Sequence, residues 1–259
     1  MGEFGALLFS CYRINGVNLS MTTVTTAPEA EYWLQTGWME EPGAELGIRK
    51  PVTIDRKTNL HEHRAYWCVR RAQDIFFSLL ALIALSPLML LTCIAVWIDS
   101  PGASPVFSQL RVGRNGKLFR LYKFRSMITL AEADGKPALC QKRDKRLTRV
   151  GRFLREHHLD ELPQLWNVLK GEMSFVGPRP ERKYFVDQIK SINPDYEQLY
   201  QLRPGLFSAA TLYNGYTDSM TKMLERLRMD LDYLYHRSLW FDTKIIFLTV
   251  FSILVGKKF

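Results

Sequence analysis

The sequence predicts a mixed α/β, mostly helical protein in which a re-entrant helix-break-helix segment in the membrane joins a small cytoplasmic domain. Three observations predict this architecture. Residues 75–98 are apolar and carry no charge, residues 105–127 contain two β-prone segments around a turn signal, and residues 142–170 and 222–235 show the period of amphipathic helices. We therefore expect one short β-hairpin and several amphipathic helices at the membrane interface.

The composition allows one domain with extensions and predicts an anionic partner. The chain has 259 residues and a formal net charge of +9. Nucleic acid, an anionic membrane surface and phosphorylated small molecules all fit this charge. The four cysteines form no CxxC pair and have no histidine at ligand spacing, which argues against a zinc site, and their long spacing argues against a disulfide framework.

Residues 1–62 are expected to form a flexible or loosely packed extension, ahead of a domain over residues 63–259. Residues 21–62 are rich in Thr, Pro, Gly and charged side chains and show little periodicity. The apolar patch before them follows no basic segment, so a secretory signal is not expected. Met21 opens the more ordinary polar sequence, and we expect translation to start there rather than at Met1.

The uncharged run is long enough to enter a membrane. A continuous helix over its 24 residues, Ile75 to Ile98, would rise about 36 Å, which covers the thickness of a bilayer. Pro87 lies at the centre of the run and removes one backbone hydrogen bond. The hydroxyl of Ser86 can satisfy the carbonyl that Pro87 leaves without a donor.

Basic residues on both sides of the run favour a segment that enters and leaves the membrane on one face. Because basic residues stay in the cytoplasm, both ends of the segment, at about 74–99, are expected there. A kinked helix that spans the membrane, with the N-terminus outside, is the alternative. The flanking basic residues are Arg64, Arg70 and Arg71 before the run and Arg111, Arg114, Lys117, Arg120, Lys123 and Arg125 after it.

After the membrane segment, the sequence predicts a hairpin and then helices. Segments 105–113 and 117–127 are β-prone and flank an Asn-Gly pair. Residues 142–155 form a basic helix with an apolar stripe, which either lies on anionic lipid headgroups or packs on the protein's own core. Residues 222–235 form a further amphipathic helix. The apolar residues 245–255 are too few to span and are expected at the interface or against the domain.

Two adjacent carboxylates, Asp160 and Glu161, are the first candidate catalytic residues. Pro163 fits a helix only in its first turn, so the acids are expected at or just before the N-terminus of a helix over Leu162–Lys170. That position favours an ionised carboxylate and a phosphate alike. Since neighbouring residues do not share a helix face, one acid can approach phosphorus while the other binds a cation. Helix capping without chemistry is the alternative.

Downstream, Arg179 lies between two prolines, which fix the direction of its guanidinium and suit phosphate binding. The motifs KFRSM (123–127), LDELPQLWNVLKGEMSFVGPRPE (159–181) and RPG (203–205) closely resemble those of the bacterial sugar transferases of the monotopic phosphoglycosyl transferase family. The resemblance covers about residues 64–259, which it implies are the catalytic domain.

The resemblance implies a reaction and a place in the cell. Such enzymes transfer a sugar 1-phosphate from a UDP-sugar to polyprenol (undecaprenyl) phosphate and release UMP. This is the initiating step of bacterial exopolysaccharide, O-antigen or glycoprotein glycan synthesis. The chain would then be monotopic on the cytoplasmic face of the inner membrane, with membrane lipid and downstream glycosyltransferases as further partners.

The resemblance also implies roles for particular residues. Asp160 would be the nucleophile that forms a phosphosugar-enzyme intermediate, and Glu161 the ligand of Mg²⁺. The remaining implied positions are the substrate phosphate contacts Arg179, Lys123, Arg125 and Arg155 and the membrane break at Ser86-Pro87. Residues 206–216 depart from the usual family pattern after RPG, so the sugar is not predicted.

Two other functions compete with this interpretation. A membrane-anchored protein that binds anionic lipid without catalysis would explain the apolar run and the basic residues, but not the LDELPQ and GPRP motifs. A Leloir-type glycosyltransferase would release UDP rather than UMP. Nucleic-acid binding is not expected, because it leaves the apolar run without a role.

Overall fold

The computed structural model describes residues 12–14, 17–19, 64–129, 131, 137–139, 144–214 and 217–255. The chain divides into two compact units, Met1–Lys57 and Thr58–Phe259. In the first unit, β1 (Tyr12–Ile14) pairs antiparallel with β2 (Val17–Leu19). The expectations about the rest of residues 1–62, including the start at Met21, fall on residues outside this description.

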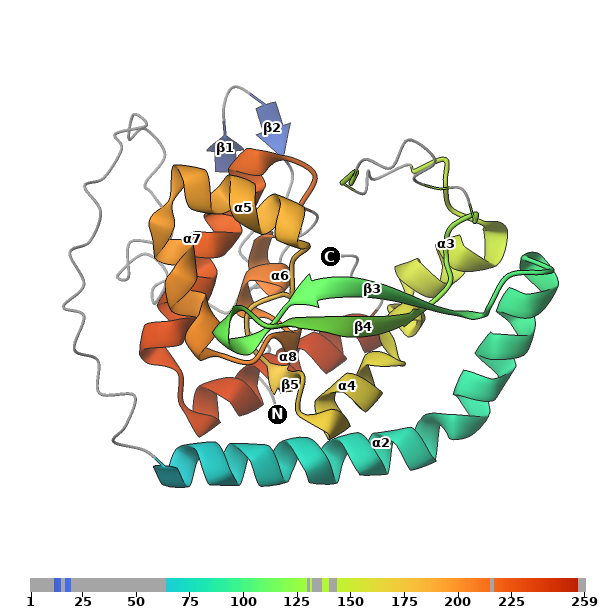
Figure 1. The fold of residues 1–259 in the computed structure, drawn as a ribbon, viewed down its shortest axis with the longest axis horizontal. Helices are drawn as coiled ribbons and strands as arrows, with labels where there is room; N and C mark the ends of the chain where they lie inside the picture. Colours follow the sequence, from blue (N-terminus) through green and yellow to red (C-terminus); the bar gives the residue numbers. More distant parts are fainter. Residues whose placement is uncertain are drawn as a thin grey trace, which may run out of the picture. The chain divides into compact units, whose positions relative to one another are not determined.

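The apolar run lies within one long helix, α2 (Arg64–Asp99), which bends partway along its length (Figure 1). Helical structure continues through Pro87, so the helix is not interrupted at Ser86-Pro87, where a break was expected. The Ser86 hydroxyl donates to the carbonyl oxygen of Ile83 at 2.8 Å, the carbonyl that would otherwise bond the missing N–H of Pro87. The predicted role of this hydroxyl is thus confirmed.

The predicted hairpin is confirmed. β3 (Val106–Val112) and β4 (Leu118–Phe124) pair antiparallel over their full lengths, from Val106 opposite Phe124 to Val112 opposite Leu118. A 3₁₀ turn, η1 (Arg114–Gly116), joins them, and Asn115 (φ 58°) and Gly116 (φ 70°) both adopt the left-handed backbone that the Asn-Gly pair predicts.

The basic helix begins later than the period of the sequence predicts. α3 spans Arg149–Glu156, whereas the prediction was 142–155, of which 142 and 143 lie outside the described residues. Thr148 caps the helix by accepting a hydrogen bond from the backbone N–H of Gly151 at 2.9 Å. Leu147, which was expected on the helix stripe, forms a β-bridge with Met127 instead.

A 3₁₀ turn, η2 (Leu159–Glu161), leads into α4 (Gln164–Lys170), which ends at Gly171 in the left-handed region (φ 85°). Two short strands follow later in the chain, β5 (Ser174–Val176) and β6 (Gly205–Phe207), and they pair in parallel. This pair could not be predicted from the sequence, because strands of three residues carry too little periodicity.

The remaining helices build the main core. Helix α5 (Lys183–Ile192), the 3₁₀ segment η3 (Pro194–Gln201) and α7 (Met220–His236) pack through the buried side chains of Phe185, Val186, Ile189, Tyr196, Leu199, Met223 and Leu227. The prediction of a helix over 222–235 is confirmed. The helices α6 (Ala209–Asn214) and α8 (Leu239–Leu254) complete the unit, and α8 begins well before the apolar run 245–255 that marked it.

Buried polar contacts fix the first part of α2 against the rest of its unit. The Arg70 guanidinium donates to the Ser174 hydroxyl at 3.1 Å and to the carbonyl of Val176, both on β5. The Asp74 carboxylate accepts from the same Ser174 hydroxyl at 3.0 Å. Arg71 donates to the carbonyls at the C-terminal end of α4, where a positive charge is favourable. The helix is therefore held by side chains and not only by its apolar surface.

Candidate active site

The acidic pair lies in the η2 turn immediately before α4, as the position of Pro163 predicted. His158 precedes the pair in the left-handed region (φ 55°), an uncommon backbone for a residue other than glycine. The Asp160 residue is 4 % exposed, and the Glu161 side chain is 14 % exposed. The backbone N–H groups of Leu165 and Trp166 in the first turn of α4 donate to the carbonyls of Leu162 and Pro163, so these two N–H groups do not bond the acids.

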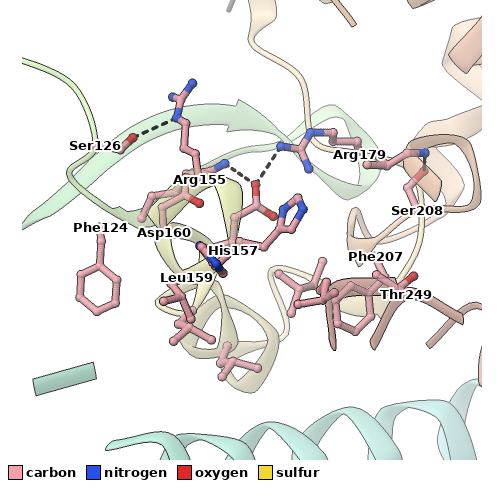
Figure 2. Close-up of a pocket in the computed structure, with 18 of the residues that line it drawn as sticks. Phe124, Ser126, Arg155, His157, Leu159, Asp160, Arg179, Phe207, Ser208 and Thr249 are labelled. Atoms are coloured by element: carbon pink, nitrogen blue, oxygen red, sulfur yellow. Dashed lines mark hydrogen bonds and ion pairs between the residues drawn. The ribbon is translucent and has the colours of Figure 1, made fainter. Parts of the chain in front are cut away.

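Two cations meet on Glu161. Lys123 Nζ lies 2.6 Å and Arg179 Nη2 lies 2.8 Å from Glu161 Oε1. Figure 2 marks the interaction of the Arg179 guanidinium with a dashed line. Burial alone would raise the pKa of this carboxyl, but Arg179 and Lys123 outweigh burial and hold the pKa of Glu161 well below its usual range. Glu161 is therefore ionised at neutral pH.

For Asp160, the effect of burial on the pKa outweighs that of the nearby cations. Burial raises the pKa of the Asp160 carboxyl, and the charge of Glu161 adds to the rise, while Lys123 and Arg155 oppose it. The carboxylate is thus poorly hydrated and close to cations that would also attract a phosphate. A desolvated carboxylate beside phosphate-binding cations is suited to attack on phosphorus.

A buried asparagine that the sequence did not mark brings Lys123 to the acidic pair. Asn167, on α4, accepts from the backbone N–H of Tyr122 at 3.1 Å and donates to the carbonyl of Arg120 at 2.7 Å. These bonds join α4 to the edge of β4 on either side of Leu121 and set the position of Lys123. In the sequence, Asn167 was only a polar residue in an apolar pattern.

Arg179 is positioned by its backbone. The carbonyl of Pro178 accepts from Gly205 N at 2.9 Å, and Gly177 N donates to the carbonyl of Phe207 at 3.0 Å, so the GPRP and RPG motifs lie side by side. The backbone N–H of Arg179 donates to the carboxylate of Asp230 on α7. Burial raises the pKa of Asp230 to about 7, although neighbouring Arg226 acts against the rise.

The other two predicted phosphate contacts differ in their surroundings. Arg155 Nε donates to the Ser126 hydroxyl at 3.0 Å, and the arginine acts on the charge of Asp160 (Figure 2). Arg125 instead donates to the carbonyl of Ser104 at 2.8 Å, and its guanidinium lies over the ring of Phe107. Lys123, Arg155 and Arg179 are therefore gathered around the acids, whereas Arg125, within the described residues, bonds Ser104 rather than the acids.

The acids line a cavity of about 2160 Å³. Its polar wall carries the acids and the cations described above, together with Ser208 and Asp218. Its apolar wall comes from two helices that are far apart in the sequence: Phe77, Leu80, Ala84, Leu85 and Leu88 of α2, and Ile246, Val250 and Ile253 of α8. One cavity thus offers a charged site and an apolar surface.

The two carboxylates suit a hard cation that also binds substrate phosphates. Mg²⁺ is usually held by one or two carboxylates together with phosphate oxygens. Lys123 and Arg179 both bond Oε1 of Glu161, which leaves Oε2 for a metal ion. Within the described residues, no three His, Cys, Asp or Glu side chains converge on an all-protein metal site. The donor set fits Mg²⁺ shared with a substrate.

Comparisons with known proteins show the family to which this chain belongs. Residues 65–256 match the family model described as bacterial sugar transferase. The chain is 42 % identical over 214 residues to a UDP-N-acetylgalactosamine-undecaprenyl-phosphate N-acetylgalactosaminephosphotransferase of Aeromonas hydrophila, covering 79 % of this chain and 49 % of that protein.

Two further relatives show similar identity. A UDP-glucose:undecaprenyl-phosphate glucose-1-phosphate transferase of Klebsiella pneumoniae is 43 % identical, over 73 % of this chain and 41 % of that protein. The exopolysaccharide production protein PSS of Rhizobium leguminosarum bv. phaseoli is 43 % identical, over 74 % of this chain and 98 % of that protein. The chain spans about half or less of the first two relatives. It belongs to the bacterial sugar transferase family.

Proposed function

We propose that this chain transfers a sugar 1-phosphate from a UDP-sugar to undecaprenyl phosphate and releases UMP. This reaction is the first step in the synthesis of a bacterial surface glycan. Family membership and the names of the relatives support this reaction. The observation that carries the proposal is the buried Asp160 carboxylate, next to an ion-paired Glu161 and to Lys123, Arg155 and Arg179, in a cavity with an apolar wall.

The reaction proceeds in two displacements. An oxygen of Asp160 attacks the β-phosphorus of the UDP-sugar, the phosphoanhydride bond breaks, and UMP leaves with the electron pair. The phosphosugar is then bound covalently to Asp160. A phosphate oxygen of undecaprenyl phosphate attacks the same phosphorus, which frees the Asp160 carboxylate and yields undecaprenyl diphosphate sugar.

The cations around the acids stabilise the charge that shifts in both steps. Lys123, Arg155 and Arg179 lie where they can bind the diphosphate and the acceptor phosphate. When bound, Mg²⁺ would be held by Glu161 and would neutralise charge on the diphosphate. The ion pairs of Glu161 with Lys123 and Arg179 keep this carboxylate ionised and fix its orientation before a substrate arrives.

The membrane arrangement is part of the proposal. α2 is a re-entrant helix whose two ends lie on the cytoplasmic face of the inner membrane, and α3 and α8 lie at the interface. Apolar side chains on α2 and α8 that the protein leaves exposed support this: Ile83 is 65 % exposed and Trp240 is 78 % exposed. The apolar wall of the cavity then continues into the bilayer and receives the polyprenyl chain.

We further propose that residues 63–259 carry this activity, that residues 1–62 are an extension outside it, and that glycosyltransferases acting on the lipid product are its functional partners. The family match over residues 65–256 supports the first of these statements.

Product analysis tests the proposed reaction. The full chain in phospholipid nanodiscs is given Mg²⁺, undecaprenyl phosphate and, one at a time, UDP-glucose, UDP-galactose, UDP-N-acetylglucosamine and UDP-N-acetylgalactosamine. We expect UMP release with at least one of them. Release of UDP would mean a Leloir-type transfer instead, and no nucleotide release with bound anionic lipid would mean a binding protein.

A further inference from the structure

Three buried polar atoms on the wall of the cavity lack a hydrogen-bond partner. Among the described residues, Thr211 Oγ1, Thr217 Oγ1 and Arg226 Nε are all inaccessible to solvent and unbonded. All three residues line the same cavity as Asp160. A buried polar atom without a partner costs about 1–3 kcal/mol, so a ligand that these side chains turn to meet in the cavity would supply the missing bonds.

Contacts connect Thr211 and the Arg226 turn of α7 to the reacting centre through Arg179. The backbone N–H of Arg179 donates to Asp230, Asp230 Oδ1 accepts from the Ser208 hydroxyl at 3.1 Å, and Ser208 Oγ accepts from the backbone N–H of Thr211 at 3.4 Å. Arg226 precedes Asp230 by one turn of α7. In the view of Figure 2, Arg179 lies between Asp160 and Ser208.

The charges of this group are already balanced. Arg226 forms an ion pair with Glu181, and Arg179 forms one with Glu161. A phosphate would gain less here than beside Lys123 and Arg155. The groups that still lack a hydrogen-bond partner are two hydroxyls, which can donate and accept, and one N–H, which can only donate. That set suits a neutral ligand rich in hydroxyl or carbonyl oxygens.

We propose that Thr211, Thr217 and Arg226 form the subsite that binds the hydroxyl or N-acyl oxygens of the transferred sugar. This inference rests on the proposed function. The sugar is bonded directly to the phosphate that Asp160 attacks, so it has to lie next to the residues that hold that phosphate, and Arg179 is one of them. The uridine is one phosphate further away and is the poorer candidate for this subsite.

The subsite would also set the choice of sugar. Thr211 lies in the segment 206–216, which departs from the usual family pattern, and relatives of nearly equal identity are named for glucose and for N-acetylgalactosamine. A site that is built to hydrogen-bond a hydroxyl of one sugar strongly rejects a sugar that lacks this hydroxyl. Thr211 and Thr217 are therefore specificity-determining residues.

Substitutions that remove only the hydroxyl test this subsite. Thr211→Val and Thr217→Val keep the volume of the side chain, and Thr211→Ser and Thr217→Ser keep the hydroxyl. Thr249→Val is the matched control, because Thr249 lines the same cavity but its hydroxyl already donates to the carbonyl of Ile245 at 2.7 Å. A thermal unfolding scan of each variant shows whether it folds.

The measurements are kcat/KM for UMP release from the four UDP-sugars named above and the inhibition constant of UMP. For the preferred sugar we expect each valine variant to lose about 3- to 10-fold in kcat/KM, the value of one hydrogen bond, with a changed preference among the sugars. The serine variants should retain the wild-type preference. Inhibition by UMP should be unchanged, because UMP has no sugar beyond its phosphate to reach the subsite.

Two results would overturn the assignment. Valine variants that behave like Thr249→Val would mean that the hydroxyls bind nothing, and a parallel loss of UMP inhibition would mean that they bind the nucleoside. If the wild-type chain releases UMP from none of the sugars, the proposed function fails separately. Equilibrium binding of the UDP-sugars and of UMP to the same variants then decides on the subsite without turnover.

Discussion

Asp160 and Glu161 are adjacent in the chain but have opposite electrostatic surroundings. Two cations hold the pKa of Glu161 low, while burial raises the pKa of Asp160. Pairs of titratable groups that are pushed apart in this way commonly divide the work at an active site. Here the division gives Glu161 a permanent charge for a metal or a cation and gives Asp160 a desolvated carboxylate.

Most residues of the site could be predicted individually, but their supports could not. The acids and Arg179 stand in motifs with turn and proline signals that define their local backbone. Asn167 and Asp230 act through contacts with residues 45 and 22 positions away, so nothing in their own neighbourhood marks them. The left-handed backbone of His158 was also not predicted, because histidine rarely adopts it.

The raised pKa of Asp230 makes a prediction about stability and pH. The folded protein binds the Asp230 proton more tightly than the unfolded chain, with a pKa of about 7 against the ordinary 3.8. The unfolded chain therefore ionises first, and this group lowers the free energy of unfolding as the pH rises from about 4 to 7. Asp230→Asn removes this loss, which the difference between the two pKa values puts on the order of 4 kcal/mol. The free energy of unfolding of the variant should therefore rise relative to that of the wild type over this pH range.

Thermal unfolding of both proteins in the same detergent, at half-unit steps from pH 4 to pH 9, measures this effect. The difference in unfolding temperature should grow up to about pH 7 and stay constant above it. A difference that does not depend on pH would contradict the buried, protonated state of Asp230.

At the scale of elements, the close contact of two glycine backbones positions Arg179. A Cβ atom on Gly205 would lie 2.2 Å from the backbone N of Gly177, and one on Gly177 would lie 2.5 Å from the carbonyl oxygen of Arg203. Only glycine at both positions lets GPRP and RPG lie side by side. The sequence marked both motifs, but it could not show that they touch, because the parallel pair of β5 and β6 is too short to leave a pattern.

Gly205→Ala tests this contact. The added methyl group should separate β5 from β6, lower the free energy of unfolding by more than about 3 kcal/mol and move Arg179 away from Glu161. Gly102→Ala is the control, since nothing lies within 4 Å of its Cβ and only the strain of φ +81° remains, about 1 kcal/mol. Equal unfolding temperatures for the two variants would contradict the role of the glycine contact.

The basic helix shows where periodicity misleads. An apolar stripe predicted one helix over 142–155, but α3 begins at Arg149. Thr148 supplies the N-cap, and Gly151 lets the helix approach the backbone of Ser126 closely, where a Cβ would be 2.0 Å from the carbonyl oxygen. Periodicity cannot detect either contact, since one concerns a cap and the other a distant segment.

At the scale of the whole Thr58–Phe259 unit, the charged site and an apolar surface share one cavity. α2 is the one helix of the described residues that is long and apolar enough to cross a membrane, and its second half is largely exposed. The cavity lies between α2, α8 and the polar wall that carries the acids. A lipid-linked phosphate could therefore reach Asp160 without leaving the bilayer surface, which is what the proposed acceptor requires.

Labelling of single cysteines tests the re-entrant topology. In a chain without its four natural cysteines, Leu60→Cys precedes α2 in the sequence and Leu110→Cys follows it. We expect a membrane-impermeant maleimide to label both from the cytoplasmic side, in inside-out vesicles, and neither in right-side-out vesicles. If position 60 is labelled only from outside, α2 spans the bilayer.

The fate of the β-phosphate of the UDP-sugar is the most direct test of sugar-phosphate transfer through Asp160. The full chain is incubated with the preferred UDP-sugar carrying ³²P in the β-phosphate, first without and then with undecaprenyl phosphate. We expect the label on the peptide that contains Asp160, its transfer to the lipid when the acceptor is added, and no label in the Asp160→Asn variant. Label that leaves the enzyme as UDP, or a fully active Asp160→Asn variant, would contradict this mechanism.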